Sequence, residues 1–256
     1  MCGICGEYLW HGKAANLTHL QAMLERLEKR GPDHLGTFSD GSLALGHRRL
    51  SIIDLSEKSH QPMVDTQLGL ALVFNGSIYN HPELRQQLQA KGHQFFSVGD
   101  SEVILKAYAE WGADCVKHFK GMFAFAIWNL QDKSLFLARD RMGIKPLYYA
   151  KTTEGIRFAS NTQALLQDPH LNTQLDPLAL HNLFSLHAVV PAPRTVLQGI
   201  RKLPPAHTLF IKANGETQER CYWQLDASRP SEEKDEAEWT EAIHEALKTA
   251  VKRRND

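Results

Sequence analysis

The stretch MFAFAIWNLQDKSLFLAR, residues 122–139, is the strongest fold signal in the sequence. Two runs of apolar, β-favouring residues, 122–129 and 134–139, flank the polar turn Gln131-Asp132-Lys133, which is the pattern of an antiparallel hairpin. Further strands are expected on both sides of this hairpin, at residues 4–10, 42–53, 68–74, 147–150 and 156–160 and as a pair around Asn214-Gly215.

Helices are expected between these strands. Leucines recur at helical spacing from Leu17 to Leu27, until Gly31-Pro32 stops the helix. Further helices are expected from the candidate caps Asn80 and Ser101, near Gln163 and after Asp176-Pro177. This mixed order differs from a regular strand–helix alternation. It predicts an α+β layered fold rather than a doubly wound parallel sheet.

The composition limits the class of function. A chain of 256 residues with 43% hydrophobic residues can bury the core of one large domain or two small ones. Its 29 lysines and arginines balance 29 aspartates and glutamates, which gives no electrostatic reason to expect nucleic acid or a membrane as partner. The longest apolar run, residues 122–128, is far shorter than the roughly 20 residues of a membrane helix, and the first residues, MCGICG, do not have the charged and then apolar pattern of a leader. We therefore expect a cytoplasmic protein whose four cysteines are reduced thiols.

The last thirty residues differ from the rest. Residues 231–241 are acidic and residues 248–254 are basic, so a domain boundary is expected near residue 225. The predicted units are a domain at 1–225 and a linker with one helix at 226–256. Two interpretations of that helix stay open: it packs back on its own domain, or it is the first helix of a second domain. Its apolar residues form one stripe of Trp239, Ile243, Ala246, Leu247, Ala250 and Val251.

Cys2 directly follows the initiator methionine. Because cysteine is small, removal of Met1 is expected, and the thiol then lies on the residue that bears the free α-amine. That amine can accept the thiol proton near neutral pH, so one residue supplies both nucleophile and base. None of the 13 histidines lies in a recognisable catalytic motif.

Several sequence blocks, taken in order, resemble the glutaminase domain of asparagine synthetases. The resemblance covers residues 1–225. The blocks are MCGICG (1–6), RGPD (30–33), HRRLSIID (47–54), QPM (61–63), FNGSIYNH (74–81), DSEVI (100–104), GMFAFA (121–126) and ARDRMGIKPLYY (138–149).

This resemblance implies both a fold and a reaction. The fold is the N-terminal-nucleophile (Ntn) hydrolase fold, a four-layer αββα sandwich of two antiparallel sheets between helices. The reaction is hydrolysis of L-glutamine to glutamate and ammonia through a cysteine thioester on Cys2, for delivery to an ATP-dependent synthetase half. No metal or organic cofactor is expected for the glutaminase step, and ATP and magnesium belong to the synthetase half.

The resemblance also implies how glutamine is held. Arg49 matches the arginine that binds the α-carboxylate, for which a guanidinium offers paired donors. Asp100 matches the carboxylate that receives the α-ammonium, and the main chain from Leu50 to Ile53 lines the same pocket. The alternatives are a solvated arginine at a strand end and an aspartate that serves only a turn or helix cap.

Asn75 and Gly76 match the oxyanion hole, with one side-chain amide and one backbone N–H as donors. The alternative for this dipeptide is a simple hairpin turn. Ser77 departs from the family pattern, because asparagine synthetases usually have a glutamate there that helps to hold the ammonium. Two interpretations stay open: Asp100 carries the ammonium alone with weaker binding, or the chain belongs to a subfamily with a different acceptor.

Two other functions compete with this one. A catalytically impaired binding or regulatory module is the first, and Ser77 motivates it. The second is a metal or redox site at Cys2 and Cys5, whose Cys-x-x-Cys spacing has no second pair elsewhere in the chain.

The expected partners follow from what the chain lacks. The Ser-Gly-Gly-x-Asp-Ser loop of the synthetase half does not occur in this sequence. We therefore expect a separate synthetase domain or subunit, with the tail helix presenting its apolar face to it. The ammonia acceptor stays undecided, and so does a homodimer.

Overall fold

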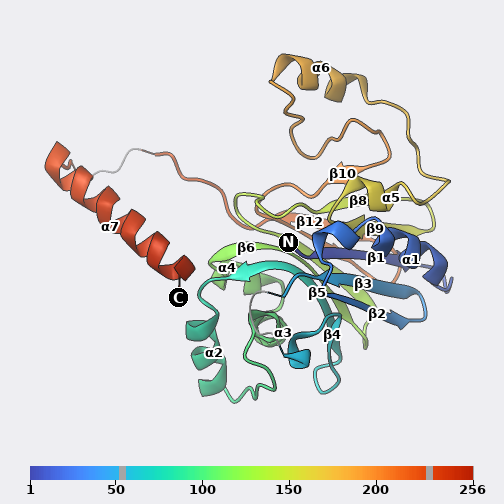
Figure 1. The fold of residues 1–256 in the computed structure, drawn as a ribbon, viewed down its shortest axis with the longest axis horizontal. Coiled ribbons are helices and arrows are strands. Elements are labelled where there is room, and N and C mark those ends of the chain that lie inside the picture. Colours follow the sequence, from blue (N-terminus) through green and yellow to red (C-terminus); the bar gives the residue numbers. More distant parts are fainter. Residues whose placement is uncertain (52–55, 229–232, 256) are drawn as a thin grey trace.

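The computed structural model describes residues 1–51, 56–228 and 233–255. Its centre consists of two six-stranded sheets in which all paired strands are antiparallel (Figure 1). The first sheet has the order β10-β8-β9-β1-β3-β2, formed by Arg201–Lys202, Tyr148–Lys151, Gly155–Ala159, Gly3–Leu9, Leu43–Arg49 and His34–Asp40. The second sheet has the order β12-β11-β7-β6-β5-β4, formed by Thr217–Cys221, His207–Ile211, Ser134–Arg139, Gly121–Asn129, Leu70–Ile78 and Met63–Asp65.

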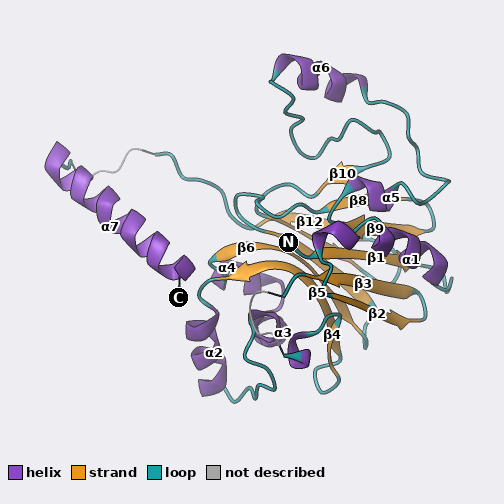
Figure 2. Ribbon diagram, in the orientation of Figure 1, coloured by secondary structure: helices purple, strands orange, loops and turns teal. Residues whose placement is uncertain are grey.

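Helices cover the outer face of each sheet (Figure 2). Helices α1 (Leu17–Glu25) and α5 (Thr162–Leu165) pack on the first sheet, and helices α2 (His81–Ala90), α3 (Asp100–Trp111) and α4 (Cys115–His118) pack on the second. Short 3-10 turns are formed by Glu28–Arg30, Glu57–Ser59 and Gly112–Asp114.

Three apolar clusters match these layers. The central cluster lies between the sheets and includes Tyr8, Trp128 and Phe158, while the two outer clusters lie between each sheet and its helices. Alternating side chains of one strand serve different clusters: Phe125 faces the helices, whereas Ala124 and Ala126 face the other sheet. The predicted four-layer α+β sandwich is confirmed.

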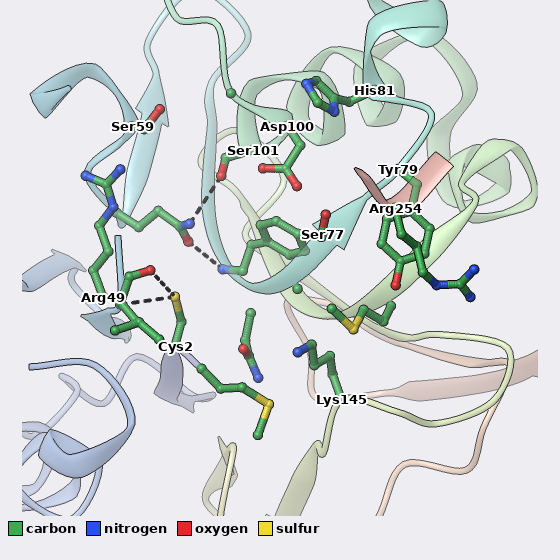
Figure 3. Close-up of a pocket in the computed structure, with 18 of the residues that line it drawn as sticks. Cys2, Arg49, Ser59, Ser77, Tyr79, His81, Asp100, Ser101, Lys145 and Arg254 are labelled. Carbon is green, nitrogen blue, oxygen red and sulfur yellow. Dashed lines mark hydrogen bonds between the residues drawn. The ribbon is translucent and has the colours of Figure 1, made fainter. Parts of the chain in front are cut away.

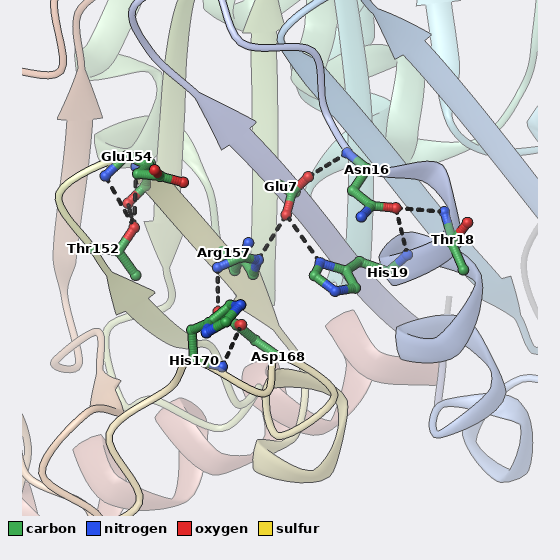
Figure 4. Close-up of polar contacts among 10 residues, drawn as sticks. Glu7, Asn16, Thr18, His19, Thr152, Glu154, Arg157, Asp168 and His170 are labelled. Carbon is green, nitrogen blue, oxygen red and sulfur yellow. Dashed lines mark hydrogen bonds and ion pairs between the residues drawn. The ribbon is translucent and has the colours of Figure 1, made fainter.

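A buried polar network ties the first sheet to its helical layer (Figure 4). Glu7 on β1 is fully buried and pairs with Arg157 on β9 at 2.7 Å. Arg157 also pairs with Asp168, and the second oxygen of Glu7 accepts the N–H of Asn16. Because a buried carboxylate is tolerated only when it is paired and hydrogen-bonded, this network allows the charge of Glu7 inside the layer.

Most predicted elements occur, with shifted bounds. The 122–139 hairpin is β6 and β7, and the pair around Asn214-Gly215 is β11 and β12. The sequence did not predict β2, β4, β10 or α4, and the predicted first helix extended beyond Glu25. It was wrong about one cap, because α3 begins at Asp100, which puts Ser101 inside the helix. Asn80 lies at the N-cap position of α2 as expected, but its side chain makes no capping hydrogen bond there.

Two helices project from the sandwich. Helix α6 (Pro177–Ser185) lies at the tip of a long excursion, and α7 (Glu236–Asn255) stands apart at the C-terminus (Figure 1). The apolar stripe of α7 is exposed, with Ile243 at 57% and Leu247 at 62%. The described stretch of the tail therefore does not pack its stripe on the sandwich. Within the described ranges, none of the helices combines the length and apolarity needed to cross a membrane.

Candidate active site

A cavity of about 500 Å³ opens near the N-terminus (Figure 3). Segments from both sheets, from the starts of α2 and α3 and from the end of α7 meet around it. Its lining consists of Met1, Cys2, Arg49, Leu50, Ser59, Gln61, Phe74, Asn75, Gly76, Ser77, Tyr79, His81, Gly99, Asp100, Ser101, Met122, Lys145, Arg253 and Arg254.

Cys2 lies at the edge of this cavity, one residue before β1. The antiparallel register pairs Gly3 with Arg48, which brings Cys2 beside the end of β3. The Leu50 N–H donates to Cys2 Sγ at 3.4 Å, and the thiol faces the Leu50 carbonyl at 3.6 Å. Arg30 Nε donates to the Cys2 carbonyl at 3.1 Å. The backbone around the thiol is thus fixed from two sides.

Asn75 and Gly76 lie inside a strand and do not form a turn. Both belong to β5, where Asn75 pairs with Ala124 and Gly76 with Phe123 of β6. The expectation that this dipeptide ends the strand was wrong, because a nine-residue ladder with β6 carries the strand through it. A Cβ on Gly76 would lie 2.2 Å from the Met122 carbonyl oxygen, so only glycine allows this close pairing.

The side chain of Asn75 holds an unpaired polar atom in the cavity wall. It is 1% exposed, and its Nδ2 has no hydrogen-bond partner among the described residues. Buried donors almost always have partners, since leaving one unpaired costs about 1–3 kcal/mol. An amide donor held unpaired at the cavity suits an acceptor that the cavity itself takes up.

Asp100 supplies a carboxylate from the first residue of α3. The residue is buried, and its Oδ2 accepts the Ile78 N–H at 2.9 Å. Burial raises the pKa of Asp100, while the Ile78 N–H and the nearby His81 act in the opposite direction. The N-terminal position on the helix also favours the charged carboxylate. Figure 3 shows this carboxylate directed into the cavity that Ser77 also lines.

Arg49 supplies a guanidinium from the last residue of β3. It is buried at the cavity, and its Nη1 donates to the Ser56 carbonyl at 3.2 Å. Gln61 braces this wall: its Oε1 accepts the Phe74 N–H at 2.6 Å, and its Nε2 donates to Ser101 Oγ at 3.2 Å. Gln61 therefore connects β5 to the start of α3.

The structure brings the site residues expected from the sequence together with one exception. Cys2, Arg49, Leu50, Asn75, Gly76, Ser77 and Asp100 all line the cavity. Ile53 lies outside the described residues.

Several polar lining residues were not assigned a role from the sequence. Gln61 and Lys145 both lie in blocks that carry the family resemblance, but their burial depends on tertiary contacts. Arg253 and Arg254 had no local signal at all, because only the placement of α7 brings them to the cavity.

The second cysteine of the Cys-x-x-Cys pair faces another layer. Cys5 is fully buried in the apolar cluster between the first sheet and α1, and burial raises the pKa of its thiol. Cys5 does not line the cavity. The spacing therefore does not bring the two sulfurs to one metal or redox site.

Comparison with known proteins agrees with this geometry. The family model described as "Glutamine amidotransferase domain" matches residues 1–223. "Asparagine synthetase [glutamine-hydrolyzing] 3" of Bacillus subtilis is 35% identical over 242 residues, which is 92% of this chain and 39% of the relative. "Asparagine synthetase [glutamine-hydrolyzing] 1" of the same organism is 34% identical over 252 residues, with 96% and 39% covered. The chain thus spans about two fifths of the length of these curated relatives.

A solved structure shows the same fold at lower identity. The glutamine phosphoribosylpyrophosphate amidotransferase of Bacillus subtilis superimposes with a TM-score of 0.63 at 20% identity, covering 88% of this chain and 50% of that one. At this identity the likeness concerns the fold alone.

Proposed function

The chain belongs to the glutamine amidotransferase family, and from this premise we propose that it hydrolyses the side-chain amide of L-glutamine to glutamate and ammonia with Cys2 as nucleophile. The observation that carries the proposal is the unpaired Nδ2 of Asn75, which is buried in the wall of the cavity that Cys2 lines. Such a donor fits an oxygen that becomes negative when the thiolate attacks the amide carbon.

The N-terminus supplies the proton chemistry. Met1 itself lines the cavity, so its removal leaves the α-amine of Cys2 at the same place. The amine accepts the thiol proton, and Sγ attacks the amide carbon to give a tetrahedral oxyanion held by Asn75 Nδ2 and the Gly76 N–H. The C–N bond then breaks, and the amine returns the proton to the leaving nitrogen, which departs as ammonia. Water hydrolyses the remaining thioester to glutamate.

Charged side chains hold the two ends of glutamine. The guanidinium of Arg49 binds the α-carboxylate, and the carboxylate of Asp100 binds the α-ammonium. Ser77 contributes a hydroxyl but no charge beside it. The main chain at Leu50 and Ile53 completes the pocket. No metal or organic cofactor takes part in this step.

The ammonia goes to an ATP-dependent synthetase domain or subunit, where ATP and magnesium act. Two observations support this partner: the chain spans about two fifths of its asparagine synthetase relatives, and α7 exposes an apolar stripe. Residues 1–225 are the glutaminase domain, and residues 226–256 lead into the partner. A cytoplasmic location, which keeps Cys2 reduced, belongs to the same proposal.

Intact-mass measurement with 6-diazo-5-oxo-norleucine, a reactive glutamine analogue, tests the proposal. We expect loss of Met1, one adduct per chain, and ammonia release from glutamine. Cys2→Ala should remove both adduct and ammonia release, whereas the matched control Cys221→Ala, at a half-buried thiol outside the cavity, should keep both.

Retained Met1, or correct processing without adduct and ammonia, would contradict the proposal. That result would favour the impaired binding module, and gain of activity in Ser77→Glu would then identify the missing charge as its cause.

A further inference from the structure

The turn between β7 and β8 is held by an extensive set of hydrogen bonds from the side chains of Asp140 and Arg139. Asp140 is fully buried, and its carboxylate accepts the backbone N–H groups of Phe123, Met142, Ile144 and Lys145 at 2.9–3.2 Å. These bonds fix the turn from the inside and tie it to β6.

Arg139 fixes the same turn from the carbonyl side. Its Nε donates to the Lys145 carbonyl at 2.8 Å, its Nη2 to the Gly143 carbonyl at 2.7 Å, and its Nη1 to the Leu203 carbonyl at 2.7 Å. Gly143 has a φ of +65°, a conformation that glycine adopts without strain. The backbone at Lys145 is therefore set by its neighbours, independently of the lysine side chain.

This turn delivers the ammonium group of Lys145 into the cavity that Cys2 lines. Lys145 is 5% exposed, and Figure 3 shows its side chain reaching into the cavity. No salt bridge joins it to a carboxylate within the described part of the chain. Its nearest acidic side chain in the turn, Asp140, already accepts four backbone N–H groups.

Three ionisable groups from separate segments act on Lys145: Arg30, Cys2 and Asp140. Burial lowers the pKa of Lys145, and Arg30 acts in the same direction, while Cys2 and Asp140 oppose them. A buried cation without a fixed partner is costly unless negative charge appears beside it. In this cavity, such charge appears when the Cys2 thiol loses its proton.

We propose that Lys145 is a further functional residue of this site, whose ammonium stabilises the negative charge that passes from Cys2 Sγ to the amide oxygen of glutamine. The inference rests on the proposed glutaminase function. It adds a cation to the neutral donors Asn75 and Gly76, and it explains why an extensively hydrogen-bonded turn lies at the cavity.

Two substitutions separate the charge of Lys145 from its volume. Lys145→Met keeps the length of the side chain and removes the charge, so kcat/KM for glutamine should fall by about tenfold or more with an unchanged melting temperature. Lys145→Arg restores charge and should recover most of that loss. Lys120→Met removes one exposed lysine outside the cavity and serves as the matched control.

The pH profile provides a readout that a structural role would not change. As pH rises, Lys145 loses its charge earlier than an ordinary lysine, so the wild-type rate should fall on the alkaline side. A guanidinium keeps its proton, so Lys145→Arg should extend activity to higher pH. If Lys145→Met fails to fold, the comparison of the alkaline limb between the wild type and Lys145→Arg tests the role of Lys145 by itself.

The two proposals fail in different ways. Wild-type kcat/KM within about twofold in Lys145→Met, or an alkaline limb unchanged in Lys145→Arg, would overturn the role of Lys145 while the Cys2 adduct leaves the glutaminase proposal intact. A wild-type chain without adduct or ammonia release would instead overturn the glutaminase proposal.

Discussion

Helices α3 and α7 both carry apolar residues at helical spacing, yet they end in opposite environments. The first eight residues of α3, Asp100 to Ala107, are all buried beneath the second sheet. Helix α7 is exposed along its length, with only Ala250 half-buried among the described side chains. The difference teaches that an amphipathic pattern predicts a face to be covered but does not identify what covers it.

The same two helices contribute differently to the cavity. Helix α3 brings Asp100 at its N-terminus from within the core, and α7 brings Arg253 and Arg254 at its C-terminus from outside. Both placements suit the helix dipole, which favours a carboxylate at the N-terminus and cations at the C-terminus. The core helix should therefore matter for both stability and binding, and the tail helix for neither to the same degree.

Matched isoleucine substitutions test this contrast most strongly. Ile104→Ala in α3 removes a fully buried side chain and should lower the free energy of unfolding by about 2–5 kcal/mol. Ile243→Ala in α7 should change it by less than about 0.5 kcal/mol, because that side chain is 57% exposed. Urea unfolding measures both. Equal losses would mean that the tail stripe is covered in solution.

Asp100→Asn should give the next largest effect, measured as a loss of kcat/KM for glutamine. It keeps an oxygen acceptor for the Ile78 N–H but removes the charge that we propose binds the glutamine ammonium. We expect kcat/KM to fall by about 10- to 100-fold, mainly through KM, which corresponds to a charge-assisted hydrogen bond of about 1.5–3 kcal/mol. Asp114→Asn, an exposed aspartate beyond the end of α3, is the control. An unchanged KM would remove Asp100 from substrate binding.

The pH dependence of KM should report the same carboxyl group. Burial raises the pKa of Asp100, so it takes up a proton at higher pH than an ordinary aspartate. As pH falls through that raised pKa, the carboxylate becomes neutral and no longer attracts the ammonium. Steady-state assays between pH 5 and 8 should show KM rising by up to about tenfold on the acid side. A rise that persists in Asp100→Asn would assign it to another group.

Arg254→Ala should have the smallest effect. The guanidinium carbon of Arg254 lies 5.1 Å from the ring centroid of Tyr79, a cation–π contact worth about 0.5–1 kcal/mol at an exposed site. We expect KM for glutamine to change by no more than about fivefold, with Lys248→Ala, earlier on the same helix, as control. A larger change would show that the tail takes part in the glutamine site.

The sequence predicted the layered architecture because its clearest strands are long and apolar and are bounded by polar turn residues. The β6–β7 hairpin needs only its own residues and its polar turn. By contrast, β2 is half polar and has no fully buried residue, and β4 has three residues, so neither carries a pattern long enough to stand out.

The cavity residues that lie in blocks of the family resemblance and have an assigned family role were predicted from the sequence. The residues whose place in the cavity depends only on how the chain packs were missed. Asn75-Gly76 has the local preference of a turn, but pairing with β6 overrides it. Lys145 and Gln61 look like ordinary polar residues in the sequence. Only the packed structure places one ammonium and one amide inside the wall.

The proposed nucleophile and the proposed oxyanion donor come from different sheets. Cys2 precedes β1 of the first sheet, whereas Asn75 lies on β5 of the second, and the apolar cluster between the sheets sets their separation. Any sliding of one sheet over the other changes the gap between sulfur and amide before it breaks a strand ladder. The rate of turnover then depends on how the two sheets are aligned. Substitutions at Tyr8 or Trp128, which lie in this cluster, are expected to lower the activity of a chain that still folds.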